Sequence, residues 1–163
     1  MAFNLRRWDE VLTDPELNKV PGRVETDRHG RIIMSPPPAP RHSRLQGRIV
    51  SLLEKLMPPG EVLPECALST ADGIKGVDAA WASPGCWAEL GNRSCFIRSP
   101  EICVEVISPS NTEEEIREKI SLFFDAGAKE VWVCGIFGAM SFYKPDGQPL
   151  SRSELCPAFP SEI

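Results

Sequence analysis

This 163-residue sequence lacks the marks of a membrane or secreted protein. Its apolar runs fall well short of the roughly 20 residues that cross a bilayer. Its opening residues, MAFNLRRWDEVL, contain no apolar core of a secretion signal. P-loop, GxSxG and strand-linked GxGxxG motifs are also absent. We therefore expect a cytoplasmic protein with no membrane association and no organic cofactor.

Histidine is scarce, since the chain has only two, and its six cysteines form no CxxC pair. These absences argue against structural zinc and leave little support for a histidine-based site. Cys103 and Cys134 lie in apolar runs, so we interpret the cysteines as small buried hydrophobic residues in a reducing compartment. A disulfide between Cys86 and Cys95 is the less favoured alternative.

A strong positive charge is missing too, because the net charge is −5. Residues 1–60 carry 10 Lys and Arg against 7 Asp and Glu, and the remainder carries 8 against 16. A dedicated nucleic-acid binder usually has the opposite balance. An acidic total is compatible with an enzyme whose own site consists of carboxylates.

The pattern that is present predicts a single domain of the α/β (α+β) class, a mixed sheet flanked by helices. We expect an N-terminal helix, a β-hairpin that turns at 27–30, an amphipathic helix over 41–56, strands over 61–70, 73–83 and 97–108, a capped helix over 112–127, a strand over 129–137 and an edge hairpin over 139–150. We expect residues 84–94 to be a loop. We divide this domain into three parts: an N-terminal helix and hairpin extension over 1–40, the core over 41–136, and a C-terminal hairpin and tail over 137–163.

Two carboxylates interrupt apolar strands. Glu105 lies in the stretch PEICVEVISPS and Asp78 in KGVDAAWAS. A buried carboxylate is costly unless it is paired, protonated or bound to a metal. The spacing suits neighbouring strands, and two such carboxylates suit a hard cation such as Mg²⁺ or Mn²⁺. We predict a metal site there, with a turn-capping role as the alternative for Asp78.

Basic residues on the two long helices are the next candidates. Lys119 follows the Glu105 strand on the next helix, where it is suited to orient an attacking water or to neutralise a phosphate. Its alternative role is that of a solvated partner of Glu115. Arg41, Arg44 and Arg48 share one helix face, which is either a solvated face or a set of phosphate contacts.

Taken together, these segments resemble the Uma-two family of bacterial restriction-endonuclease-like proteins. The resemblance rests on VDAAWASP, PEICVEVISPS, the helix with Lys119, and GAKEVWV, together with RVETDRHGRIIMSPPP and RHSRLQGR in the N-terminal part. It spans roughly residues 8–160. It implies a restriction-endonuclease-like core of the PD-(D/E)xK type, in a single domain with an N-terminal β-hairpin.

The resemblance also implies an activity, namely Mg²⁺-dependent hydrolysis of DNA phosphodiester bonds through a metal-bound water. Asp78 and Glu105 would then be the metal ligands. The usual lysine position, two residues after the glutamate, holds Ile107, and Lys119 is placed to replace it. Glu25 and His42 match acidic and histidine positions of the family and are further catalytic candidates.

Simpler interpretations stay open for this set of residues. Glu25 would also be explained as a hairpin acid paired with Arg23 or Arg31, and His42 as a residue near a helix start. The whole chain would also be explained as a catalytically degenerate nuclease-fold module that binds or regulates a partner. DNA is the expected partner of the enzyme, and either interpretation allows a homodimer.

Overall fold

The structure is a computed structural model that describes residues 1–163. Its elements are α1 (Ala2–Thr13), a 3₁₀ turn (Leu17–Lys19), β1 (Arg23–Thr26), β2 (Ile32–Ser35), α2 (Pro40–Leu56), β3 (Glu61–Thr70), β4 (Gly73–Ala82), α3 (Pro84–Leu90), β5 (Ile102–Val106), α4 (Glu113–Asp125), β6 (Glu130–Cys134), β7 (Met140–Tyr143) and β8 (Pro149–Leu150). No helix combines the length and the apolar character that crossing a membrane requires.

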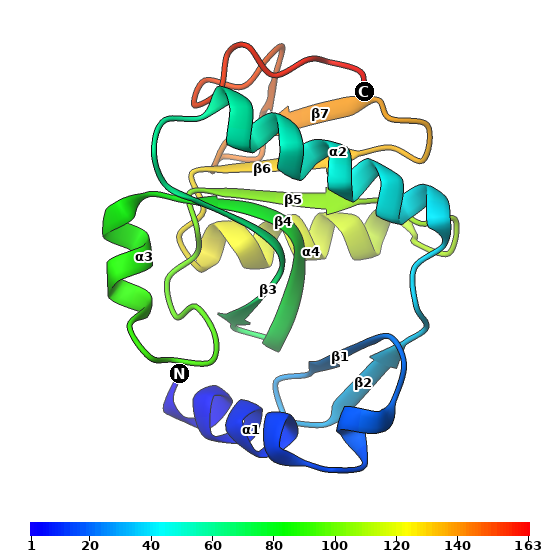
Figure 1. Ribbon diagram of the computed structural model, residues 1–163, viewed down its shortest axis with the longest axis vertical. Helices are drawn as coiled ribbons and strands as arrows, with labels where there is room; N and C mark the ends of the chain where they lie inside the picture. Colours follow the sequence, from blue (N-terminus) through cyan, green and yellow to red (C-terminus); the bar gives the residue numbers. More distant parts are fainter.

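Six strands form one mixed sheet in the order β3-β4-β5-β6-β7-β8. Only β5 and β6 run parallel, and α4 provides the crossover that a parallel pair needs. Helix α2 covers one face of the sheet and α4 the other (Figure 1). The predicted fold class, a mixed sheet flanked by helices with an N-terminal hairpin, is confirmed.

The two faces of the sheet have separate apolar cores. On the α2 side, Leu45, Ile49 and Leu53 of the helix are buried in a cluster that includes Trp132 of β6. These leucine and isoleucine positions recur at helical spacing, so burial of this stripe stabilises α2 where it lies. On the α4 side, Phe123 is fully buried in a second cluster. Both helices are therefore fixed against the strands that carry Asp78 and Glu105.

The start of α4 is determined by its sequence. Thr112 and Glu115 form the predicted capping box, in which each side chain accepts a hydrogen bond from the backbone N–H of the other residue. Three glutamates in the first turn add a favourable interaction with the helix dipole. Because the cap fixes the first turn, it also fixes which side of α4 carries Lys119.

The prediction of a loop over 84–94 is wrong for its first half, which is the short helix α3. Ser83 caps this helix by accepting a hydrogen bond from the Cys86 N–H, and Pro84 occupies the first turn, where its missing N–H costs nothing. The less favoured alternative of a Cys86–Cys95 disulfide is wrong, because all six cysteines are free.

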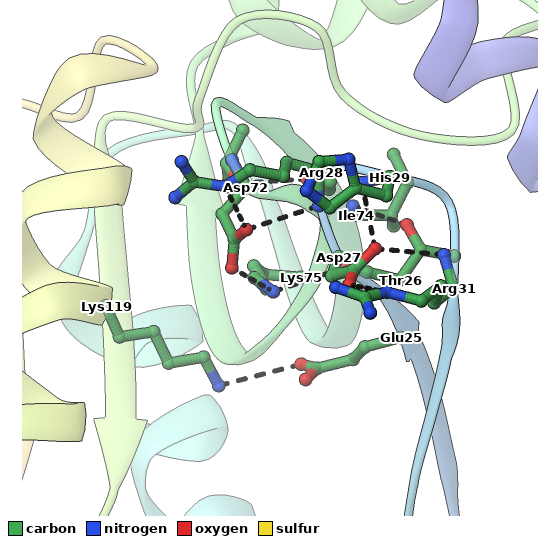
Figure 2. A network of polar contacts seen from close by, with 12 residues as sticks. Glu25, Thr26, Asp27, Arg28, His29, Arg31, Asp72, Ile74, Lys75 and Lys119 are labelled. Carbon is green, nitrogen blue, oxygen red and sulfur yellow. Dashed lines mark hydrogen bonds and ion pairs between the residues drawn. The ribbon is translucent and has the colours of Figure 1, made fainter.

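The β1–β2 hairpin forms a separate two-stranded sheet that lies against the turn end of β3 and β4. Thr26 connects the two sheets, because its hydroxyl accepts from the Ile74 N–H and its carbonyl accepts from Lys75. Arg28 and Asp72 join the two turns with an ion pair of 3.1 Å, as Figure 2 shows. These contacts hold β1, and with it Glu25, beside β4.

The pairing of β3 with β4 is interrupted at one position, without a change of register. Pro64 pairs with Ala79 and Cys66 with Val77, so the intervening Glu65 lies opposite Asp78 but is not paired with it. Glu65 is also the only residue other than glycine with a positive φ, at 49°. Such a φ departs from the extended backbone of a regular strand. The irregularity therefore lies directly across from Asp78 on the neighbouring strand.

Candidate active site

Asp78 and Glu105 come together at the end of the β4–β5 ladder. The ladder pairs Ala79 with Val104, and one step further in the same register brings Asp78 to Glu105. Both side chains are nearly inaccessible, with 2% and 5% of their surface exposed. The convergence of two buried carboxylates on adjacent strands, which the sequence pattern indicated, is present.

Asp78 is surrounded by donors. Its Oδ1 lies 2.5 Å from Arg23 Nη2, while its Oδ2 accepts from the Val106 N–H at 2.7 Å and lies 3.4 Å from His42 Nε2. Burial alone would raise the pKa of Asp78, but the His42 hydrogen bond, the Arg23 charge and the Val106 N–H together lower it to about 2. Asp78 is therefore ionised at neutral pH.

Glu105 has the opposite character. Its Oε2 accepts from Lys119 Nζ at 3.0 Å, but its Oε1 is buried and has no hydrogen-bond partner. Burial, and after it the negative charge of Asp78, raises the pKa of Glu105 from 4.5 to about 7. The two carboxylates thus differ in protonation near neutral pH, and Glu105 Oε1 is an acceptor that lacks a donor or a cation.

Lys119 lies between two acids from different elements. Besides Glu105 it approaches Glu25 Oε1 at 3.7 Å, and Figure 2 shows the side chain reaching from α4 towards the hairpin. Burial lowers its pKa, but Glu105 and Glu25 outweigh this effect, so the pKa lies above the usual lysine value. The alternative pairing with Glu115 is wrong, because that carboxylate caps α4 instead.

Glu25 contributes a third carboxylate to the same place. Its Oε1 accepts from the Gly76 N–H at 2.7 Å and lies 3.9 Å from Arg23 Nη1. Of the two alternative partners considered for Glu25, Arg31 is excluded because it pairs with Asp27 at 2.7 Å. Arg23 is close to Glu25, but its shorter contact is to Asp78.

His42 lies on α2 and faces Asp78. The hydrogen bond to Asp78 is the main reason why the pKa of His42 lies above its usual value. Its other ring nitrogen, Nδ1, is buried without a partner. One turn further on, Gln46 Nε2 donates to the Asp78 carbonyl at 2.8 Å. Helix α2 therefore holds both the backbone and the side chain of Asp78.

Three residues of this site do not appear among the sequence candidates: Arg23, Gln46 and Glu65. Two of them carried a usable signal. Arg23 precedes Glu25 by two residues, so strand alternation puts both on one face. Gln46 follows His42 by four residues, which puts both on one side of the helix. Glu65, which lies 3.7 Å from Arg23, has only the adjacent Pro64 as a sign that strand pairing is interrupted there.

A groove of about 1150 Å³ runs over the site. Its wall includes Arg23, Glu25, His42, Asp78, Glu105 and Lys119, from β1, α2, β4, β5 and α4. Among the three helix arginines, Arg41 lines the groove and lies over the exposed ring of Phe137, 5.3 Å from its centre. Arg44 and Arg48 are exposed outside the groove wall.

The donor set suits a hard cation more than a soft one. Carboxylate oxygens are the ligands that Mg²⁺ and Mn²⁺ prefer, and Glu105 Oε1 is free to act as one. No group of three or more His, Cys, Asp or Glu side chains is arranged as a metal site. A cation held by Asp78 and Glu105 would therefore keep much of its water shell.

The comparisons with known proteins agree with this architecture. The model of the Uma2 family, described as "Putative restriction endonuclease", matches residues 8–151. A crystal structure from Anabaena variabilis ATCC 29413, titled a "putative nuclease belonging to DUF820", superimposes with a TM-score of 0.65 at 20% sequence identity. The superposition covers 83% of this chain and 80% of that one, which establishes a shared fold. No curated protein matches the sequence.

Proposed function

From the premise that the chain belongs to the Uma2 family of restriction-endonuclease-like proteins, we propose that it is an endonuclease that hydrolyses phosphodiester bonds in DNA with the help of Mg²⁺ or Mn²⁺. The observation that carries this proposal is Glu105 Oε1, a buried acceptor without a partner beside the ionised Asp78. A buried polar atom that lacks a partner needs an explanation, and a cation supplies one.

Asp78 and Glu105 would hold the cation. When bound, the ion would supply positive charge at the scissile phosphate and make a water molecule a stronger nucleophile. The same positive charge would favour the ionised form of Glu105, whose burial is otherwise unfavourable. The site residues fit such an ion in their chemistry, and His42 and Gln46 hold Asp78 in position for it.

Lys119 has a separate task in this proposal. Since its pKa lies above the usual lysine value, its amine stays protonated and does not act as a general base. A fixed ammonium in a largely buried place stabilises the negative charge that develops on a phosphate in the transition state. Lys119 reaches the groove from α4, on the side opposite to α2, so it would contact the phosphate from another direction than His42.

The proposal is tested by incubating supercoiled plasmid and a labelled oligonucleotide duplex with the pure protein and Mg²⁺, Mn²⁺ or EDTA. We expect cleavage only with a divalent ion, and none by Asp78→Asn purified in the same way. Equal trace activity in both proteins would identify a contaminant. In that case the degenerate binding or regulatory module would become the better interpretation.

One observation favours that second candidate. Arg23 already pairs with Asp78 and Lys119 with Glu105, so both carboxylates have a charge partner without any metal. A degenerate site in which the arginine has permanently replaced the cation would show no Mn²⁺ binding. Isothermal titration with Mn²⁺ therefore separates the two candidates independently of cleavage.

We also expect Arg41→Ala to weaken DNA binding about 3- to 10-fold, because a phosphate contact of one arginine typically contributes about 1 kcal/mol. Arg48→Ala is the matched control on the same helix, and it should change affinity less than twofold since Arg48 lies outside the groove wall. Fluorescence anisotropy with a labelled duplex, in EDTA to prevent cleavage, measures both. Equal losses in the two variants would contradict the assignment of the groove as the DNA site.

A further inference from the structure

Arg23 is the residue whose position is least expected in a site for a divalent cation. It extends from β1 into a cluster of acidic side chains, where its guanidinium lies 2.5 Å from Asp78, 3.7 Å from Glu65 and 3.9 Å from Glu25. About a fifth of its side chain, 22%, is exposed, and it forms part of the groove wall. The guanidinium is thus buried enough to form a strong ion pair with Asp78. It is also close enough to solvent to move away from that carboxylate.

The charges of the site leave room for a cation. Four carboxylates, Glu25, Glu65, Asp78 and Glu105, face two cations, Arg23 and Lys119, so with all four ionised these side chains carry a net charge of −2. A divalent cation would offset this charge even if Arg23 stayed in place. The reason for an exchange therefore lies in the direct contact between Arg23 and Asp78.

A cation on Asp78 would also meet the guanidinium directly. Mg²⁺ ligands lie about 2 Å from the ion, and Arg23 Nη2 is in contact with Oδ1 of the same carboxylate. Like charges at such a separation repel strongly in a partly buried place. Asp78 therefore cannot hold both partners at full strength.

We propose that Arg23 is an exchangeable counter-ion, which neutralises Asp78 while the site is free of metal and leaves it when a divalent cation binds. This inference rests on the proposed function and adds a control of metal affinity to it. The backbone of β1 has no need to move, because Thr26 and Glu25 remain bonded to Ile74 and Gly76 of β4. Only the long arginine side chain changes place.

The first test compares Mn²⁺ affinity by isothermal titration in the wild type, Arg23→Gln and Arg31→Gln. Arg31 belongs to the same hairpin, pairs with Asp27 and lies outside the groove, so it is the matched control. We expect Arg23→Gln to bind Mn²⁺ about tenfold more tightly, a usual coupling within one charge network. We expect no change in Arg31→Gln, and a lower melting temperature of Arg23→Gln without metal.

The second test follows the guanidinium itself in the wild type, so it does not depend on a variant that folds. The ¹⁵N-detected side-chain signal of Arg23, assigned by its absence in Arg23→Gln or by triple-resonance spectra, is recorded with and without saturating Mg²⁺. Exchange predicts that the signal moves or broadens towards that of a solvated arginine. An unchanged signal at saturation would overturn the proposal.

The outcomes separate this inference from the proposed function. If the wild type and Arg23→Gln both fail to bind Mn²⁺, the metal site itself is wrong and the inference fails with it. If the wild type binds Mn²⁺ and Arg23→Gln binds it equally well or more weakly, the metal site stands and the exchange is wrong. Tighter Mn²⁺ binding by Arg23→Gln, together with an Arg23 side-chain signal that shifts or broadens when Mg²⁺ is added, supports both the metal site and the exchange.

Discussion

Glu105→Gln is expected to lower DNA cleavage by a factor of about 10³ or more and, above pH 7, to make the protein more stable than the wild type. The loss of activity follows because the amide removes the negative charge that would hold a cation beside Asp78. The gain in stability follows because the wild type keeps an ionised carboxylate buried, with Oε1 unpartnered. A variant that gains stability while it loses activity cannot owe that loss to unfolding.

The direction of the stability change comes from proton binding. The pKa of Glu105 is about 7 in the folded protein, owing to burial and then to Asp78, against 4.5 ordinarily. Between these values the folded state binds more protons than the unfolded one, so the free energy of unfolding falls as the pH rises. The loss of folding stability caused by the buried, ionised Glu105 is absent below about pH 4.5 and complete above about pH 7, where it amounts to roughly 1–3 kcal/mol.

The measurement is urea denaturation in EDTA at pH 5 and pH 8.5. We expect Glu105→Gln and the wild type to differ little at pH 5 and the variant to be the more stable at pH 8.5. Glu61→Gln, a change at an exposed glutamate of β3, should follow the wild type at both values. A less stable Glu105→Gln at pH 8.5 would mean that Lys119 compensates the buried charge fully and that the site is preformed without a metal.

The pKa shift of Asp78 has the opposite effect on the pH dependence of stability. Its pKa of about 2 lies below the ordinary 3.8, despite the opposing effect of burial, because His42, Arg23 and the Val106 N–H favour the ionised form. Its contribution to stability is therefore present above about pH 4 and lost as the pH falls through about 2. The two neighbouring acids thus oppose each other in the pH dependence of stability, and only Glu105 acts in the neutral range.

The carboxylate pair was predictable because it violates a local rule. Asp78 and Glu105 are charged residues in stretches that otherwise consist of buried strand residues, and such violations concentrate at functional sites. The strands themselves and the caps of α4 are equally local, since a strand alternates over a few residues and a capping box spans four. For these features the sequence contains the whole physical cause.

Arg23 was not predictable in the same way, because its role depends on a contact between separate sheets. The register of the β1–β2 hairpin against β4 is set by the Thr26 contacts, 48 and 49 residues away in the sequence. No periodic pattern in the sequence indicates a contact over such a separation along the chain. The same holds for the helix arginines, since α2 presents Arg41, Arg44 and Arg48 alike and only the turn that carries Phe137 singles out Arg41.

Short elements escaped prediction for another reason. Helix α3 has seven residues, too few for a periodic pattern to stand out, and its only signals are the Ser83 cap and Pro84. The interruption of pairing at Glu65 involves a single residue in a strand of otherwise ordinary composition. A non-glycine residue with positive φ costs about 1 kcal/mol or more, and its place beside Asp78 and Arg23 is where such strain is usually found.

Lys119→Gln is expected to lower the rate of DNA cleavage by a factor of about 10² to 10³ while DNA affinity changes only a few-fold. The reason is that a fixed, largely buried ammonium stabilises the transition state more than the bound substrate. Lys119 meets these conditions, because only 19% of its side chain is exposed and two carboxylates hold it. Arg117→Gln, an exposed change two residues earlier on the same helix, should leave cleavage unaltered.

A purely structural role for Lys119 makes a different prediction, because the lysine would then matter only through Glu105. Lys119→Gln would in that case destabilise the protein by leaving Glu105 without its partner, and cleavage at saturating metal would recover once the protein is folded. Single-turnover cleavage, DNA anisotropy and urea denaturation of the same preparations separate the two roles.

Lys119→Arg adds the last distinction, since it keeps the charge but alters its geometry. Partial activity in Lys119→Arg, together with a folded but inactive Lys119→Gln, would assign the ammonium to the reaction, whereas normal cleavage by Lys119→Gln would limit Lys119 to holding Glu105 in place.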